Sequence, residues 1–177
     1  ENFIKEQINL LDSYVLGDPM DEKTDMGPMA RPDLLEKIEQ QVKDSISLGA
    51  KLLYGGKRKG DNFYEPTLIT NVGKGMPLYD EESFGPVAVI IEVDGHEEAI
   101  EVANDTIFGL GASIWTEDAD IAKEMAKKIN AGAVFINGMT KSDPRLSFGG
   151  IKQSGYGREL GSLGIREFLN AKTVWIK

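Results

Sequence analysis

Hydrophobic and polar residues follow two patterns along the chain, and each pattern predicts a different kind of secondary-structure element. Segments with apolar residues at every third or fourth position have the spacing of one helix face. Short apolar runs between them end at glycine, proline or polar clusters, as strands do. The predicted helices cover residues 4–15, 32–48, 97–104, 118–129 and 158–169. The predicted strands cover residues 51–54, 63–70, 87–93, 110–115, 133–136 and 173–176.

The order of these elements predicts the fold class. From residue 87 onward, strand and helix alternate as in βαβ units, which indicates an α/β sheet flanked by helices. The apolar run at 87–93 predicts a strand that is covered on both faces. Pro66 interrupts the strand at 63–70, which predicts a position at an edge or an entry of a sheet. No capping residue precedes the first helix, so we expect this helix to be incomplete.

Length and charge narrow the class of protein. The 177 residues suffice for one domain with a real core. The net charge of −9 argues against binding to nucleic acid or to an anionic membrane surface. No apolar run is long enough to cross a membrane, and there is no secretory signal pattern. We therefore expect a soluble, cytoplasmic protein with neither nucleic acid nor membrane among its partners.

The sequence contains no cysteine and one histidine, which limits its chemistry. Without cysteine the chain has no disulfide, no zinc–thiolate or iron–sulfur site and no thiol nucleophile. This composition fits a reducing cytoplasm. His96 lies among Asp94, Glu97 and Glu98 at the start of a predicted helix, so we predict an exposed surface residue. No metal site is predicted.

Residues 82–87, Glu-Ser-Phe-Gly-Pro-Val, form the first candidate binding segment. Glu82 and Phe84 are two positions apart at the mouth of a predicted strand, so we expect their side chains on one side. A carboxylate accepts hydrogen bonds from both hydroxyls of a ribose, and an aromatic face packs on a flat heterocycle. Gly85 removes a Cβ that would block close approach. The segment therefore has the groups to hold the nicotinamide end of a dinucleotide. The alternative is an ordinary entry into a strand with one buried Phe.

The long loop at 137–157 is the second candidate site, because it leaves the carboxyl end of a predicted strand. The Ser142 hydroxyl and the Arg145 guanidinium have the chemistry to hold a carboxylate. Phe148 would form the wall of an apolar pocket. The alternative is that Arg145 pairs with Asp143 on a solvated loop and that Phe148 is a core residue.

Several ordered motifs together resemble the C-terminal portion of the aldehyde dehydrogenase superfamily, nearly from end to end of the chain. The first is Glu-x-Phe-Gly-Pro-Val at 82–87, and the second is Asn-Asp followed by Phe-Gly-Leu at 104–110. In the third, at 148–159, Phe-Gly-Gly, Lys, Ser-Gly and Gly-Arg-Glu follow one another. Shorter matching segments are 17–19, 26–28 and 173–175. Residues 135–138 and 142–145 are most similar to bacterial and archaeal succinate-semialdehyde dehydrogenases.

The resemblance implies a three-layer α/β catalytic domain over residues 1–160 and a C-terminal helix with an oligomerisation strand over residues 161–177. It implies an enzyme that uses NAD or NADP to oxidise an aldehyde, with succinate semialdehyde as the expected substrate, and that forms a homo-oligomer. In the family a cysteine thiolate attacks the aldehyde, the thiohemiacetal gives hydride to NAD(P)⁺, and an activated water releases the acid.

The same resemblance implies roles for individual residues. Glu82 is expected to bind the nicotinamide ribose, and Phe84 is expected to pack beside the nicotinamide. Ser142 lies where related semialdehyde enzymes meet the distal carboxylate of the substrate, and Arg145 is close to it in the sequence. Phe148 is expected to line the substrate tunnel.

The chain also departs from the family pattern. The nucleophilic cysteine, the general base, the oxyanion-hole asparagine and the dinucleotide-binding domain precede the matched region in the family and are absent here. We therefore expect a fragment that is inactive by itself. One alternative is a stand-alone, non-catalytic module for oligomerisation or regulation. Another is a different nicotinamide enzyme, such as a phosphorylating reductase, which would lack the combination of motifs at 84–86 and 157–159.

Overall fold

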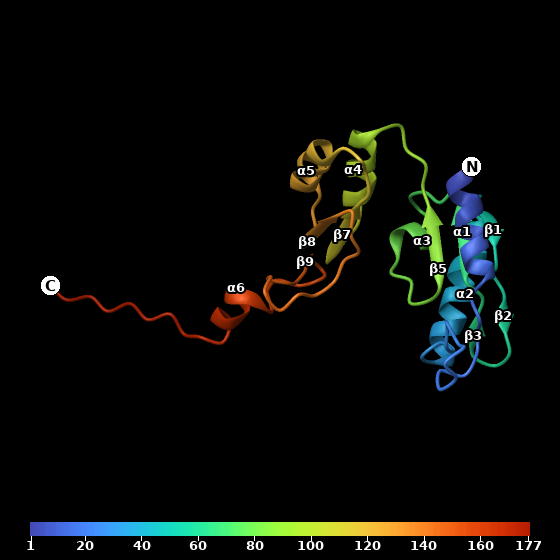
Figure 1. Ribbon diagram of the computed structural model, residues 1–177, viewed down its shortest axis with the longest axis horizontal. Coiled ribbons are helices and arrows are strands. Elements are labelled where there is room, and N and C mark those ends of the chain that lie inside the picture. Colours follow the sequence, from blue (N-terminus) through green and yellow to red (C-terminus); the bar gives the residue numbers. More distant parts are fainter. The chain divides into compact units, whose positions relative to one another are not determined.

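Both units of the chain, residues 1–92 and residues 93–177, contain helices and strands, so the predicted α/β class is confirmed (Figure 1). The computed structural model describes all residues from 1 to 177. No helix has the length and apolar character needed to cross a membrane. The first unit contains α1 (Asn2–Asp12), α2 (Pro32–Ser47), β1 (Lys51–Tyr54), β2 (Arg58–Lys59), β3 (Phe63–Tyr64), β4 (Thr67–Thr70), α3 (Pro77–Asp80) and β5 (Val87–Ile90). The second contains α4 (His96–Asn104), β6 (Phe108–Gly109), β7 (Gly111–Ile114), α5 (Ala119–Lys128), β8 (Ala133–Ile136), β9 (Ile151–Lys152) and α6 (Gly161–Arg166).

A three-stranded sheet in the order β1-β4-β5 forms one layer of the first unit. β4 runs antiparallel to β1 and parallel to β5, with Thr67 paired to Val87. It is therefore the central strand, and nearly all of its side chains are buried. The single strand predicted for residues 63–70 divides at Pro66, and the edge position is wrong for its second half, β4. The predicted entry position fits, because Pro66 lies directly before the first residue of β4. Pro66 has no N–H, and β3 pairs separately with β2.

The helix α2 contributes one apolar face to the core. Leu35, Ile38 and Val42 recur at helical spacing, and each is at most 2 % exposed. They belong to one core cluster with Ile69 of the central strand. The helix begins with Pro32 at its first turn and ends before Gly49, whose φ of 113° is in the region that glycine favours. The helix predicted here from the sequence is confirmed.

Other elements of the first unit differ from the prediction in extent. α1 ends at Asp12 and does not continue to Val15, whose N–H donates to Asp25 Oδ2 at 2.9 Å. β5 ends at Ile90 and leaves Ala88 exposed, so this chain does not cover both faces of the strand. The short helix α3 was not predicted from the sequence.

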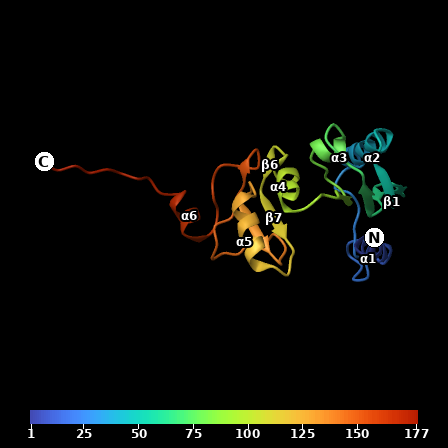
Figure 2. The same cartoon turned by 90° about the horizontal axis from the view of Figure 1, so that it is seen from above.

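The second unit contains a βαβ arrangement. β7 and β8 are parallel neighbours, with Gly111 paired to Ala133, and α5 connects them in sequence. α5 contacts β8, and α4 lies next to α5 (Figure 2). The helix α5 begins after Asp118, whose carboxylate accepts hydrogen bonds from the N–H groups of Asp120 at 3.0 Å and Ile121 at 2.9 Å. The helix and the strands predicted for this part of the chain are confirmed.

The C-terminal residues depart most from the prediction. The helix expected at 158–169 is reduced to the six residues of α6. The reason is that Glu159 exchanges two backbone hydrogen bonds with Phe148, each 2.8 Å long, and is thereby kept in an extended pairing. Residues 170–177 form no strand, and Trp175 is 84 % exposed. A strand requires hydrogen bonds to a neighbouring strand, and these residues pair with no strand of this chain.

Candidate functional site

The irregular segment between α3 and β5 carries Glu82 and Phe84 at the protein surface. Phe84 is 61 % exposed, so it is not the buried residue of an ordinary strand entry. Glu82 is exposed as well. Within this chain, both side chains are therefore accessible to a ligand.

Gly85 meets a packing requirement inside the protein. A Cβ on this residue would lie 2.9 Å from Ile38 Cγ1 and 3.3 Å from Met29 Cε. Both distances are shorter than ordinary van der Waals contacts, so the segment rests directly on α2. The sequence predicted that close approach requires glycine here, but the group that approaches Gly85 is this helix and not a ligand.

A cavity of about 460 Å³ lies beside Phe84. Two chain segments, residues 26–30 and 83–86, form most of its wall, which is mainly apolar. Asn62 fixes the first segment, because the Met29 N–H donates to Asn62 O at 2.8 Å and the Asn62 amide donates back to Met29 O. An apolar cavity with a few polar groups is the usual environment of a small-molecule site.

Tyr64 belongs to the wall of this cavity and carries a buried hydroxyl. The residue is 2 % exposed, and its hydroxyl has no hydrogen-bond partner in the chain. Burial raises the pKa of Tyr64 to about 12, and the charges of Glu39 and Glu65 act in the same direction. A buried donor without a partner is unfavourable for folding.

Arg145 is engaged with a neighbour on the second candidate loop. Its Nε donates to Asp143 Oδ1 at 2.9 Å, and its Nη2 donates to Asp143 Oδ2 at 2.6 Å. These hydrogen bonds lower the pKa of Asp143 to about 2 and raise the pKa of Arg145. The pairing is thus the one foreseen as the alternative from the sequence. Ser142 is exposed next to this pair.

Phe148 is half-buried and lines a surface hollow of about 480 Å³ together with the glycine-rich segment that follows it. Arg158 joins two points of that segment, because its Nη1 donates to the carbonyl oxygens of Gly150 at 2.9 Å and Gly157 at 2.8 Å. A Cβ on Gly150 would lie 2.5 Å from Ser154 Cβ. The glycine here permits close packing of the chain on itself, and Phe148 retains access to the hollow.

Two residues near Glu82 and Phe84 were not predicted from the sequence. Gln41 interrupts the apolar face of α2 three positions after Ile38 and is only 4 % exposed. A polar residue on the buried face of an amphipathic helix is the signal that could have identified it. Tyr64 lies within a predicted strand, where a tyrosine gives no comparable signal.

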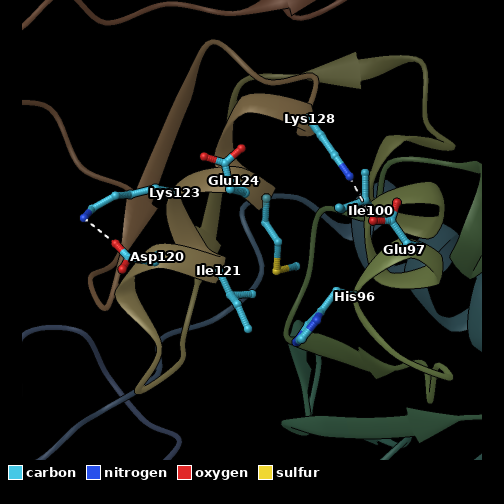
Figure 3. A pocket seen from close by; sticks show the side chains of 9 residues that line it. His96, Glu97, Ile100, Asp120, Ile121, Lys123, Glu124 and Lys128 are labelled. Atoms are coloured by element: carbon cyan, nitrogen blue, oxygen red, sulfur yellow. Dashed lines mark hydrogen bonds and ion pairs between the residues drawn. The ribbon is translucent and has the colours of Figure 1, made fainter.

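A groove of about 490 Å³ separates α4 from α5 in the second unit (Figure 3). Its charged side chains form ion pairs, with Lys128 Nζ 2.8 Å from Glu97 Oε1 and Lys123 Nζ 2.9 Å from Asp120 Oδ1. His96 is exposed at the side of the groove, as predicted. No group of His, Cys, Asp or Glu side chains is arranged to hold a metal ion. Four of the charged side chains that line the groove are thus paired with one another.

The chain belongs to the aldehyde dehydrogenase family, because a sequence model of that family matches residues 1–174. This confirms the resemblance drawn from the ordered motifs. A probable succinate-semialdehyde dehydrogenase (NADP⁺) of Synechocystis sp. is 52 % identical over 178 residues, covering 99 % of this chain and 39 % of the relative. A succinate-semialdehyde dehydrogenase (NADP⁺) of Mycobacterium avium is 49 % identical, covering 99 % of this chain and 38 % of the relative. The chain therefore spans about two fifths of the length of these curated relatives.

Solved structures of the family share this fold. The succinic semialdehyde dehydrogenase of Streptococcus pyogenes, in complex with NADP⁺, matches with a TM-score of 0.94 and 41 % identity, covering 99 % of this chain and 39 % of the other. The betaine aldehyde dehydrogenase of Staphylococcus aureus, in complex with NAD⁺, matches with a TM-score of 0.91 and 36 % identity, covering 97 % of this chain and 35 % of the other.

Proposed function

We propose that this chain is part of an NAD(P)-dependent aldehyde dehydrogenase and that it contacts the nicotinamide end of the cofactor. The observation that carries the proposal is the exposed pair Glu82 and Phe84 beside an apolar cavity. It is supported by relatives whose names include NADP⁺ and by solved relatives in complex with NADP⁺ or NAD⁺. In this proposal the full-length protein oxidises an aldehyde to its carboxylic acid, and succinate semialdehyde is the first candidate.

Glu82 and Phe84 have separate tasks in this proposal. The Glu82 carboxylate accepts hydrogen bonds from both hydroxyls of the nicotinamide ribose. The Phe84 ring packs beside the nicotinamide and excludes water from it. The mainly apolar wall of the cavity fits a ligand that brings a flat ring. The chemistry that the bound dinucleotide supplies is the acceptance of hydride from the substrate.

The nucleophile of the proposed reaction must come from outside this chain, because none of the 177 residues is a cysteine. This agrees with the 39 % of the Synechocystis relative's length that the chain covers. The thiolate attacks the aldehyde carbon, and water finally releases the acid from the cysteine. The residues of this chain then orient the cofactor and bind the far end of the substrate.

Ser142, Arg145 and Phe148 are the proposed substrate contacts. The Ser142 hydroxyl donates to the distal carboxylate of a semialdehyde, and Arg145 joins it when its guanidinium exchanges the Asp143 carboxylate for that of the substrate. Phe148 lines the path of the aldehyde. The support is the exposure of Ser142 and the access of Phe148 to a surface hollow.

Arg145→Ala in the full-length protein tests the anion contact. We expect the KM for succinate semialdehyde to rise about tenfold, because a charge-assisted hydrogen bond is lost. The KM for an uncharged aldehyde of similar size should not change. Lys141→Ala, which removes a neighbouring exposed cation, is the matched control. Equal changes in KM for both aldehydes would exclude Arg145 as the anion site.

We also propose that residues 1–160 belong to a three-layer catalytic domain and that residues 161–177 form an oligomerisation segment. The support is a run of exposed apolar side chains near the C-terminus, including Trp175. Such a run, with unpaired backbone groups beside it, is suited to pairing with a second subunit. We thus propose that the full-length protein is a homo-oligomer and that it lies in the cytoplasm.

Aldehyde-dependent reduction of NADP⁺ tests the proposed activity. We expect NADPH formation from succinate semialdehyde by the full-length protein and none by the 177-residue chain alone. NADPH formation by the chain alone would refute a nucleophile located outside it. A full-length protein that assembles but oxidises no aldehyde would favour the non-catalytic oligomerisation module.

A further inference from the structure

We infer that Gln41 is a positioning residue for the cofactor contacts, because its buried amide holds three consecutive residues of the segment that carries Glu82 and Phe84. The inference rests on the proposed function of that segment. Gln41 lies on α2, about 40 positions earlier in the sequence, and does not itself reach the surface, being 4 % exposed. Its role is therefore exerted through the segment 81–83.

Both the nitrogen and the oxygen of the Gln41 side-chain amide form hydrogen bonds. Its Nε2 donates to Glu81 Oε2 at 2.9 Å and, at 3.4 Å, to the backbone oxygen of Glu82. Its Oε1 accepts a hydrogen bond from Ser83 Oγ at 3.1 Å. One side chain thus fixes the residue before Glu82, the backbone of Glu82 and the residue after it.

Only an amide satisfies these partners together, because it combines donors with an acceptor on one planar group. A carboxylate at position 41 would keep the acceptor for Ser83 but would lose the donor. It would also place a second negative charge beside Glu81. Lys37 Nζ lies 3.8 Å from Glu81 Oε2 and balances the negative charge of that one carboxylate. A half-satisfied buried network is less favourable than either a complete one or none.

A second contact holds the other end of the segment. Gly85 rests on Ile38, which is one helical turn before Gln41, at a distance that leaves no room for a Cβ. The segment is thus held on α2 at residues 81–83 and again at residue 85. Between these points the Glu82 carboxylate and the Phe84 ring remain exposed. Rigid support of this kind keeps binding groups in one geometry and lowers the cost of ordering them when a ligand binds.

Gln41→Met in the full-length protein tests the inference, since methionine fills a similar volume without either hydrogen bond. We expect NADP⁺ to bind about tenfold more weakly, measured as the dissociation constant and as the KM for NADP⁺. The KM for the aldehyde should not change. Ser83→Ala, which removes one of the bonds and leaves α2 intact, should weaken NADP⁺ binding by about threefold. This variant keeps the test valid if Gln41→Met does not fold.

Ser45→Ala is the matched control. Ser45 lies one turn further along the same buried face, is 0 % exposed, and accepts a hydrogen bond from the Leu78 N–H at 3.1 Å. Its loss should lower stability without changing the affinity for NADP⁺. Equal weakening of NADP⁺ binding by Ser45→Ala and Gln41→Met would overturn the inference, because Gln41 would then have only a general structural role.

Glu82→Ala separates this inference from the proposed function. If Glu82→Ala weakens NADP⁺ binding but neither Gln41→Met nor Ser83→Ala does, the positioning role of Gln41 is refuted and the cofactor site stands. If Glu82→Ala leaves the affinity unchanged, the cofactor site itself is refuted, and with it the inference that depends on it.

Discussion

Gly85 links the packing of the first unit to its proposed cofactor contacts. The residue lies so close to α2 that a Cβ would be 2.9 Å from Ile38 Cγ1. Its neighbour Phe84 nevertheless remains 61 % exposed. The contact between Gly85 and α2 therefore sets the position of the Phe84 ring, while the ring itself stays accessible to a ligand.

We expect Gly85→Ala to lower the free energy of unfolding by about 1 to 3 kcal/mol, because overpacking displaces neighbouring atoms. Gly73→Ala is the control, since a Cβ at that position meets no heavy atom within 4 Å. Urea unfolding of both variants measures the difference. If both variants were equally stable, the segment would not press on α2.

The buried Tyr64 hydroxyl predicts a loss of stability at alkaline pH. Its pKa is raised from 10.0 to about 12, mainly by burial, so the folded protein holds this proton more tightly than the unfolded chain does. The resulting stabilisation is present below about pH 10 and is lost as the pH rises toward about 12, by no more than about 3 kcal/mol. Tyr64→Phe should remove this dependence and should not destabilise the protein at neutral pH, because it deletes an unpartnered hydroxyl.

Free energies of unfolding at about pH 7 and about pH 11 check the prediction for Tyr64. The wild-type protein should lose more stability between these values than the Tyr64→Phe variant. Equal losses in the two proteins would show that this hydroxyl does not titrate with a raised pKa.

The sequence offered the exposed residues of the candidate sites as candidates, but it gave no indication of the residues that support them. Six consecutive positions made Glu82 and Phe84 candidates and left an ordinary strand entry open, and the motifs at 104–110 and 148–159 then favoured a cofactor contact. Gln41 contacts Glu82 across 41 positions of sequence, and no local pattern reports such a distance. The Arg145–Asp143 pair, two positions apart, was foreseen as an alternative for the same reason: it is local.

At the scale of elements, the predictable ones have both a periodic apolar face and explicit end signals. α2 has Pro32 at its start and Gly49 after its end, and α5 has Asp118 before its first turn. Elements whose limits depend on tertiary pairing were predicted less well. α6 begins late because Glu159 pairs with Phe148, and the central position of β4 depends on its pairing with β5.

Asp118→Ala should lower the free energy of unfolding by about 1 kcal/mol, because the N–H groups of Asp120 and Ile121 lose their acceptor. Glu117→Ala changes an adjacent exposed acid outside the cap and serves as the control. Chemical denaturation followed by circular dichroism measures both variants. Equal stability of the two would indicate that the Asp118 carboxylate does not cap α5.

At the scale of the whole molecule, the motif order predicted the family, because it extends over nearly the entire chain. The sequence could not show how its C-terminal residues would be arranged in a single chain. A strand at 173–176 requires hydrogen bonds to a neighbouring strand, and these residues pair with none of this chain's strands. The subunit contact of residues 173–176 therefore stays a prediction.

We expect Trp175→Glu to shift the full-length protein from an oligomer to smaller species in sedimentation velocity, because a charge would replace an apolar side chain at the proposed subunit contact. Met20→Glu is the control, since Met20 is 88 % exposed and lies outside the oligomerisation segment. An unchanged sedimentation profile for Trp175→Glu would exclude this residue from the subunit contact.

The central claim is that Glu82 and Phe84 hold the nicotinamide end of the cofactor. The most direct measurement is a crystal structure of the full-length protein with NADP⁺. The account predicts both hydroxyls of the nicotinamide ribose within hydrogen-bond distance of the Glu82 carboxylate and the nicotinamide packed beside the Phe84 ring. A nicotinamide ribose bound elsewhere, with Glu82 and Phe84 still in contact only with solvent, would contradict it.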